Sequence, residues 1–155
     1  MNDETSPAPA APAAQPSFRV SGLDDSLGVE VVHASADEVV LRYAIDQRHH
    51  QPFGIVHGGV HCAVTETACS IGASMSARAR GQAGAVGLEN HTSFLHAVRR
   101  GTVTVTARPL TRGRRTQLWE AVSRDQDGTL VATGRVRLLC VEPEMEVAGE
   151  RVRPK

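Results

Sequence analysis

One segment of this 155-residue chain has the spacing of an α-helix, and it lies within a sequence that otherwise favours strands. Between Gly58 and about Arg78, apolar side chains recur on one stripe with a period of 3.6 residues. The stripe consists of Val60, Val64, Thr67, Ala68, Ile71 and Met75. The other faces carry small residues rather than the Lys and Glu of a solvent-facing helix. The helix is therefore predicted to pack against neighbours on more than one side.

The rest of the chain favours strands because Val, with 19 copies, is its commonest large apolar residue. β-Branched residues fit a pleated backbone better than a helix. Alternating patterns and turn signals predict six strands, at residues 28–33, 39–45, 86–95, 101–110, 115–124 and 129–141. One helix among short-linked strands predicts an α+β domain, in which a six-stranded antiparallel sheet wraps around one long central helix.

Composition limits the remaining possibilities. The Pro- and Ala-rich residues 1–17 are predicted to be a disordered leader, residues 18–141 a single domain and residues 142–155 a charged tail. Lys plus Arg and Asp plus Glu both number 17, and this balance argues against a nucleic-acid partner. No apolar stretch is long enough to span a membrane, and the acidic N-terminus is unlike a signal peptide. We therefore expect a cytoplasmic protein.

Glu66 is the helix residue that packing does not explain. At 100° per residue it lies roughly opposite Val60 and Val64, and Ser70 projects beside it one turn later. A carboxylate among small, half-buried residues is costly unless it has a partner or a task. Glu66 is therefore a candidate general base or nucleophile. The alternative is a surface glutamate at the edge of a subunit.

The start of the helix supplies a second element. Gly58 and Gly59 follow His57 where the loop becomes helix, so free backbone N–H groups lie at the positive end of the helix dipole. Such groups can polarise a carbonyl oxygen, although a Gly-Gly pair alone often marks only a turn. Together with a carboxylate two turns along, the junction predicts oxyanion donors and a base that face one pocket.

Two runs of sequence carry a family resemblance: FGIVHGGVHCAVTE from Phe53 to Glu66, and GLENHTSFL from Gly87 to Leu95. They resemble the hotdog-fold acyl-CoA thioesterases, in particular the phenylacetate-pathway and 4-hydroxybenzoyl-CoA types that keep an acidic residue on the central helix. The resemblance covers roughly residues 25–141. It implies hydrolysis of an acyl-CoA, with aromatic acyl groups favoured. It also implies homodimers, usually paired into homotetramers, with pockets at the dimer interface that draw the Gly58 loop and Glu66 from opposite subunits.

Carried onto this sequence, the resemblance makes Glu66 the catalytic carboxylate and the Gly58 N–H the donor to the thioester carbonyl. Gln51 would contact the reacting group, Ser70 would position the water or the intermediate, and His57 would order the loop or take part in the chemistry. Further substrate contacts are expected from Gly59, Asn90, His96, Arg114 and Arg115, with the arginines meeting the coenzyme A phosphates. No metal or redox cofactor is required, since coenzyme A enters as part of the substrate.

Other interpretations remain at this point. His57 and His61 are four residues apart beside Cys62, as in a helical metal pair, but no third ligand can be named. The three cysteines lack Cys-x-x-Cys spacing and are expected to be reduced packing residues rather than nucleophiles. The main alternative to an enzyme is a non-catalytic hotdog module that binds acyl-CoA as a sensor. Such a module would not need a carboxylate beside the thioester.

Overall fold

The computed structural model describes residues 20–151, so the predicted leader lies outside the described residues. The predicted long helix is confirmed as α2, Gly58–Arg78. The six predicted strands are confirmed as well. They are β1 Glu30–Ala34, β2 Val39–Ala44, β3 Gly84–Phe94, β4 Thr102–Arg112, β5 Thr116–Asp125 and β6 Leu130–Val141.

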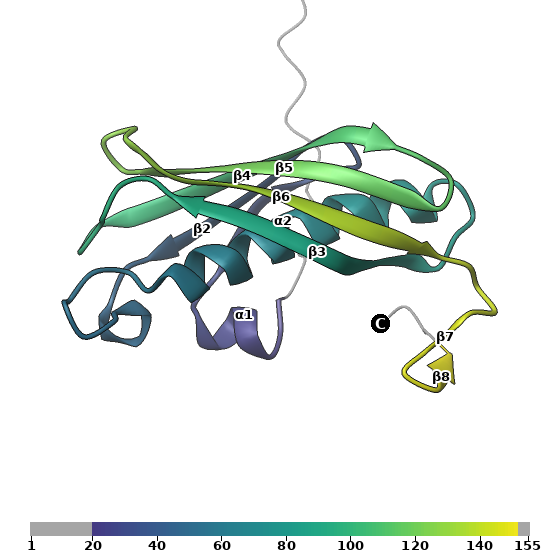
Figure 1. Ribbon diagram of the computed structural model, residues 1–155, viewed down its shortest axis with the longest axis horizontal. Coiled ribbons are helices and arrows are strands. Elements are labelled where there is room, and N and C mark those ends of the chain that lie inside the picture. Colours follow the sequence, from purple (N-terminus) through teal and green to yellow (C-terminus); the bar gives the residue numbers. More distant parts are fainter. Residues whose placement is uncertain (1–19, 152–155) are drawn as a thin grey trace, which may run out of the picture.

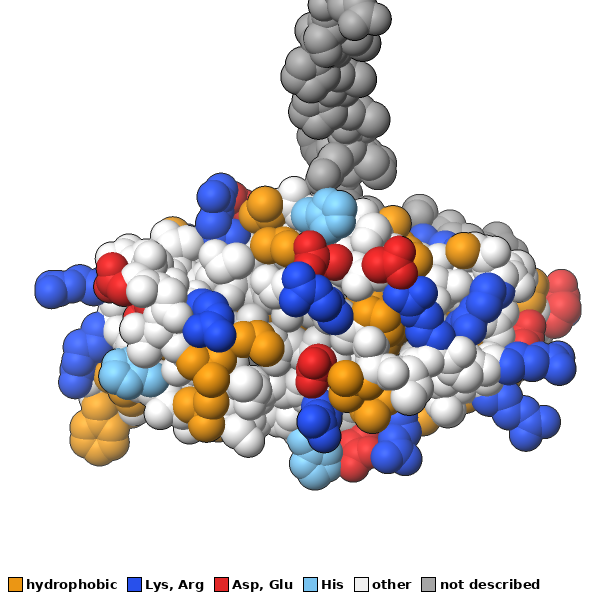
Figure 2. All heavy atoms as spheres, turned by 90° about the horizontal axis from the view of Figure 1, so that it is seen from above, with side chains coloured by type: hydrophobic (Ala, Val, Ile, Leu, Met, Phe, Trp, Pro, Cys, Tyr) orange, Lys and Arg blue, Asp and Glu red, His pale blue; other side chains and the backbone are white. Residues whose placement is uncertain are grey.

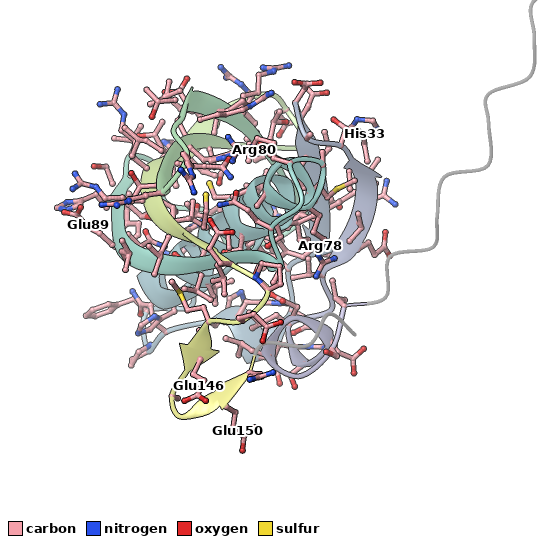
Figure 3. All side chains as sticks on the ribbon, turned by 90° about the vertical axis from the view of Figure 1, so that its right-hand side faces the viewer. His33, Arg78, Arg80, Glu89, Glu146 and Glu150 are labelled. Atoms are coloured by element: carbon pink, nitrogen blue, oxygen red, sulfur yellow. The ribbon has the colours of Figure 1, made fainter. Side chains whose placement is uncertain are left out.

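The strands form one antiparallel sheet in the order β1-β2-β4-β5-β6-β3, which arches over α2 (Figure 1). After α2 the chain does not return beside β2. It runs along the far edge and pairs β3 with β6, while β2 pairs with β4. Seen along the helix, the sheet curves around α2, with Glu89 of β3 and His33 of β1 on opposite sides (Figure 3). The 11-residue β3 is therefore an edge strand.

The small residues of α2 allow close contact with the inner face of the sheet. A Cβ atom at Gly72 would overlap the ring of Trp119, which is fully buried on β5. The Trp119 indole N–H donates to the Gln117 side-chain oxygen at 3.0 Å, and the Gln117 amide donates to the Ala73 carbonyl at 3.0 Å. Burying a large apolar side chain contributes about 1.5–3 kcal/mol. The prediction that the helix packs on more than one side is confirmed.

Four short elements have no counterpart in the sequence prediction. They are α1 Leu23–Ser26, the 3-10 helix η1 Gln47–His49, β7 Glu146–Val147 and β8 Glu150–Arg151. Elements this short carry too few residues for a periodic pattern. A hydrogen bond of 2.7 Å from the Thr67 hydroxyl to Asp24 ties α1 to α2, whereas β7 and β8 form a two-stranded sheet of their own.

The outer face of the sheet carries interspersed charges of both signs (Figure 2). Among them, Arg42 pairs with Glu30 at 2.7 Å and Arg137 with Glu89 at 3.4 Å. Alternating charges of this kind do not make a continuous basic surface. Within residues 20–151, no helix combines the length and the apolar character needed to cross a membrane.

Candidate active site

A loop that contains η1 delivers the chain to the start of α2. Asp46 accepts a hydrogen bond from the Arg48 backbone at 2.9 Å, and hydrogen bonding to the Arg48 side chain lowers the pKa of Asp46. The backbone N–H of Asp46 donates to Nδ1 of the buried His49 at 3.0 Å. His49 therefore uses Nε2 as its donor, toward the Leu27 carbonyl at 2.8 Å. The N–H of His57 donates to the His49 carbonyl at 2.8 Å, which fixes the loop against this anchor.

His57 caps α2 and determines which N–H groups of its first turn remain free. Its Nδ1 accepts the Gly59 N–H at 2.8 Å, and its carbonyl accepts the Val60 N–H at 2.9 Å. Among the described residues no hydrogen bond uses the Gly58 N–H, which lies at the positive end of the helix dipole. The predicted oxyanion donor at Gly58 is thus free for a ligand. The Gly59 N–H is already engaged.

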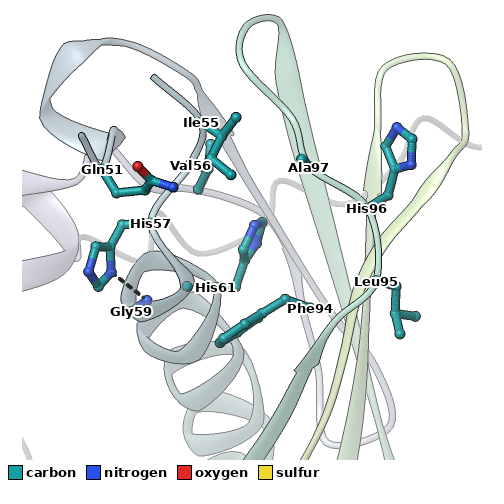
Figure 4. A pocket seen from close by; sticks show the side chains of 11 residues that line it. Gln51, Ile55, Val56, His57, Gly59, His61, Phe94, Leu95, His96 and Ala97 are labelled. Atoms are coloured by element: carbon teal, nitrogen blue, oxygen red, sulfur yellow. Dashed lines mark hydrogen bonds between the residues drawn. The ribbon is translucent and has the colours of Figure 1, made fainter. Parts of the chain in front are cut away.

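Gly58 lines a pocket of about 450 Å³ at this end of α2 (Figure 4). The pocket brings together the predicted site residues Gln51, His57, Gly58, Gly59 and His96, and its other walls are Ile55, Val56, His61, Phe94, Leu95 and Ala97. A tight turn holds Gln51, because its backbone carbonyl accepts the Gly54 N–H at 2.8 Å. Its side-chain oxygen accepts the Phe53 N–H. Five of the predicted residues therefore meet in one largely apolar cavity.

Phe94, at the end of β3, covers one side of this cavity. A Cβ atom at Gly58 would overlap its ring, so the close approach of Phe94 requires a glycine here. The ring of His61 lies 6.0 Å from the Phe94 ring, with a tilt of 34°. His61 is only 4% exposed, and burial lowers the pKa of its imidazole. At pH 7 the wall beside Phe94 is therefore uncharged.

Glu66 lies half-buried in the middle of α2, where β3 holds its carboxylate. The side-chain amide of Asn90 donates to Glu66 Oε2 at 3.0 Å and to the Cys62 carbonyl at 3.1 Å. The Asn90 oxygen in turn accepts from the Thr92 hydroxyl at 2.7 Å. Asn90, predicted as a substrate contact, orients the candidate catalytic carboxylate in this structure. No Lys or Arg in residues 20–151 forms an ion pair with Glu66.

The backbone of β3 is shaped to receive this carboxylate. A Cβ atom at Gly87 would overlap Glu66 Oε1. The pairing of β3 with β6 shifts register between Gly87 and Glu89, as at a β-bulge. A glycine at an irregularity is a common way for a strand to approach another group closely. Gly87 therefore belongs to the site although the sequence analysis gave it no role.

Glu66 and Ser70 open into a second pocket, of about 280 Å³, on the side of α2 that the sheet does not cover. Asp24, Thr67, Ile71, Ser74, Met75 and Arg78 complete its walls. The expectation that oxyanion donor and base face one pocket is therefore wrong for a single chain. The eight residues from Gly58 to Glu66 correspond to about 12 Å along the helix and about 80° of net rotation. The companion expectation, that two chains share the site, remains a prediction.

The predicted phosphate contacts lie apart from one another. Arg114 and Arg115 are exposed in the turn between β4 and β5, and the Gln82 amide donates to the Arg114 carbonyl at 3.0 Å. Gln82 follows the C-terminal end of α2, whereas the Gly58 pocket lies at the N-terminal end. A helix of 21 residues is about 30 Å long. Of the three predicted basic contacts, only His96 lines the Gly58 pocket of its own chain.

The cysteines show the features of packing residues. Cys69 and Cys140 are buried and Cys62 is half-buried, and all three are free thiols. Burial raises the pKa of the Cys69 thiol, and the charge of Glu66 raises it further, so Cys69 stays protonated at neutral pH. In the described part of the chain, no three His, Cys, Asp or Glu side chains are grouped as metal ligands would be.

Two residues of the Gly58 pocket were missed as site residues. His61 was weighed only as a metal ligand, although a ring with two nitrogens between Val60 and Val64, on a helix predicted to be buried, was a usable signal. Phe94 appeared only as part of a strand motif. Its contact with Gly58 spans 36 positions, and no local pattern could have indicated it.

Comparisons with known proteins agree with this geometry. The thioesterase superfamily matches residues 53–132. A proofreading thioesterase of Cronobacter turicensis is 37% identical over 76% of this chain and 84% of its own length. A 1,4-dihydroxy-2-naphthoyl-CoA hydrolase of Listeria monocytogenes is 34% identical over 74% of this chain and 91% of its own length. The solved structure of a Haemophilus influenzae thioesterase is 32% identical, covers 79% of this chain and 85% of its own, and superposes with a TM-score of 0.74.

The matched region runs from the loop before α2 through β3, β4 and β5 into β6, so it contains every residue of the two pockets except Gln51 and Asp24. The sheet wrapped on a single helix is the arrangement that the solved thioesterase shares. The chain therefore belongs to the thioesterase superfamily, has the hotdog fold and is a thioester hydrolase.

Proposed function

We propose that this protein hydrolyses an acyl-CoA, with an aromatic acyl group preferred, to the free acid and coenzyme A. The observation that carries the proposal is Glu66, a half-buried carboxylate that Asn90 orients and that no Lys or Arg of the described residues pairs with. The largely apolar Gly58 pocket suits an aryl group. The relative named as a 1,4-dihydroxy-2-naphthoyl-CoA hydrolase supports an aromatic substrate.

In the proposed reaction, the thioester carbonyl oxygen accepts a hydrogen bond from the Gly58 N–H. Donors aimed at a developing oxyanion typically contribute on the order of 3 kcal/mol to lowering the barrier. Glu66 either takes a proton from a water that attacks the carbonyl carbon, or attacks that carbon itself to form an anhydride that a water then hydrolyses, which frees the Glu66 carboxylate. The carbon–sulfur bond breaks, coenzyme A leaves as its thiol, and the water contributes the second carboxyl oxygen of the acid. Ser70, which lines the same pocket as Glu66, is placed to position that water.

The working unit in this proposal is a homodimer, with dimers paired into tetramers. Leu88, Phe94 and Leu95 are all more than half exposed on or just after the edge strand β3. Exposed strand edges pair readily with another chain, and a two-fold axis near the middle of β3 would set its Phe94 end beside residues 84–89 of the second copy. Phe94 covers Gly58 and Gly87 adjoins Glu66. This pairing would therefore bring the Gly58 pocket of one copy to the Glu66 of the other.

The same antiparallel pairing supports the proposed coenzyme A contacts. It would bring the β4–β5 turn of the second copy toward the end of α2 that carries the Gly58 pocket. Arg114 and Arg115 lie in that turn, and the structure shows no carboxylate paired with either among the described residues. Planar guanidinium groups suit phosphate oxygens. His96 at the pocket is the third proposed contact.

The experiment that tests this function is thiol release from a panel of aryl-CoAs and of short- to medium-chain acyl-CoAs. Glu66→Gln keeps the shape of the side chain and removes its charge, so we expect the rate to fall by about a hundredfold or more. Glu30→Gln, the same change at an exposed acid on β1, the edge strand opposite β3, is the matched control and should stay close to wild type. Wild-type protein that binds these thioesters tightly and hydrolyses none would instead favour the acyl-CoA sensor.

A further inference from the structure

His61 is a buried imidazole with no hydrogen-bond partner among residues 20–151. It lies on the first turns of α2 and is only 4% exposed. Its Nδ1 is fully shielded from solvent and has no hydrogen-bond partner among the described residues, whereas Nε2, to which no described residue hydrogen-bonds either, is not shielded and is the nitrogen that a ligand can reach. Most buried polar groups in folded proteins are satisfied, so an unpaired imidazole in a cavity wall calls for a ligand or a function.

His61 lines the Gly58 pocket next to Phe94. Figure 4 shows its ring between the helix and Phe94, on the side of the cavity away from His57. Phe94 packs against Gly58, and its ring lies 6.0 Å from the His61 ring. A thioester whose carbonyl binds the Gly58 N–H would therefore have His61 and Phe94 within reach of its acyl group.

The neutral state of the imidazole limits which chemical groups His61 can bind. No carboxylate of the described residues pairs with His61, and its burial disfavours the charged form. A neutral imidazole offers one donor and one acceptor. A hydroxyl group, which both donates and accepts, matches such a ring in either tautomer, whereas a carboxylate only accepts and binds most strongly to a charged donor.

We propose that His61 determines acyl specificity by hydrogen bonding to a hydroxyl group on the acyl part of the substrate. This inference rests on the proposed function only in taking the Gly58 pocket as the acyl site. A substrate without the hydroxyl would cover the imidazole and leave it unpaired, and sites built to bind a hydroxyl discriminate strongly against such analogues. Phe94 supplies the apolar face that accommodates the ring of the acyl group.

The test compares benzoyl-CoA with its 2-, 3- and 4-hydroxy forms and measures, for each isomer, the ratio of kcat/KM to that of benzoyl-CoA. We expect wild type to favour at least one hydroxylated isomer by about tenfold or more. His61→Phe, which keeps a ring without nitrogen atoms, should bring that ratio close to one. His61→Asn, which keeps a donor and an acceptor, should retain part of it. His33→Phe, the same change on β1, is the control for folding and should keep the wild-type ratio.

Non-hydrolysable thioether analogues of the same compounds separate this inference from the proposed function. Calorimetric affinities should show the same His61-dependent preference even if the protein hydrolyses none of the thioesters. In the wild-type protein, the ¹⁵N imidazole signals of His61 should shift with the preferred hydroxylated analogue and not with the unsubstituted one. A preference that survives in His61→Phe, or a wild-type protein that prefers none of the three isomers, would overturn the inference.

Discussion

The two pockets on α2 differ in what they offer a substrate. The Gly58 pocket is bordered by Phe94 and Leu95 and presents a backbone N–H at the positive end of a helix. The Glu66 pocket lies on the exposed side of the same helix, where a carboxylate adjoins the hydroxyl of Ser70. The first suits an apolar acyl group and a developing oxyanion, and the second suits water and a base. In the proposed function, one chain therefore carries both halves of the hydrolytic site without joining them.

The largest expected effect comes from mixed dimers, which test whether the Gly58 pocket of one chain and the Glu66 pocket of another form one site. If each site takes Gln51 and Gly58 from one chain and Glu66 from the other, a Glu66→Gln chain and a Gln51→Ala chain complement each other. Random pairing in a two-fold dimer makes half of the molecules hybrids with one intact site each, so about a quarter of wild-type activity should return. The returning activity is measured as thiol release, after the two variant chains are co-expressed or after they are unfolded and refolded together. Activity no higher than that of the separate variants would show that the halves are not shared.

Gly87→Ala should perturb the Glu66 pocket and leave the Gly58 pocket of the same chain unchanged. The added methyl group would overlap Glu66 Oε1, so the carboxylate must move away from its place beside Asn90. A misplacement of about 1 Å at a reacting group can lower activity by about a hundredfold. Stability should change little, since glycine within a strand is itself weakly unfavourable. Steady-state kinetics together with urea denaturation checks both points. A variant that keeps its activity would contradict the assigned role of Glu66.

His57→Ala should perturb the Gly58 pocket and leave the Glu66 pocket of the same chain unchanged. Removing Nδ1 leaves the Gly59 N–H without its acceptor, and losing a helix cap typically costs about 1 kcal/mol of unfolding free energy. His57→Asn keeps a side-chain acceptor and should recover most of that loss. Urea denaturation of the two variants measures the difference. Equal stability of wild type and both variants would show that the cap does not hold the helix start.

The smallest expected effect is a pH dependence of stability due to His61. Burial holds the pKa of this imidazole below its ordinary value of 6.5, so the unfolded chain takes up the proton more readily than the folded one. The stability that a neutral His61 contributes is present above pH 6.5 and is lost as the pH falls below it toward the folded pKa. His61→Phe should therefore show a shallower decline in unfolding free energy between about pH 7 and pH 5. If the unfolding free energies of wild type and His61→Phe fell in parallel over this pH range, the result would contradict a contribution from His61.

Local patterns were sufficient for much of the fold. The bounds of α2 follow from a 3.6-residue stripe, and the six strands follow from alternation and turn signals such as that at Gly128. Glu66 was identifiable because an acid among small residues contradicts its own helix pattern. The sequence pattern did not reveal the order of the strands in the sheet. β3 lies at the edge next to β6 because it pairs with residues about 50 positions away, and nothing in its own sequence specifies that partner.

The sequence by itself determined the helix and the strands of this protein. It also showed that Glu66 does not fit the pattern of its helix and that N–H groups after His57 are free. Each of these features depends on residues within a few positions. Only the tertiary structure decided that Asn90 orients Glu66, that Phe94 covers Gly58 and that Nδ1 of His61 is buried without a partner in the described part of the chain. It also separated Gly58 from Glu66 into two pockets. These features join side chains from α2 and β3, or depend on how α2 is covered. Contacts between distant segments are set by how the sheet closes on the helix, not by local periodicity.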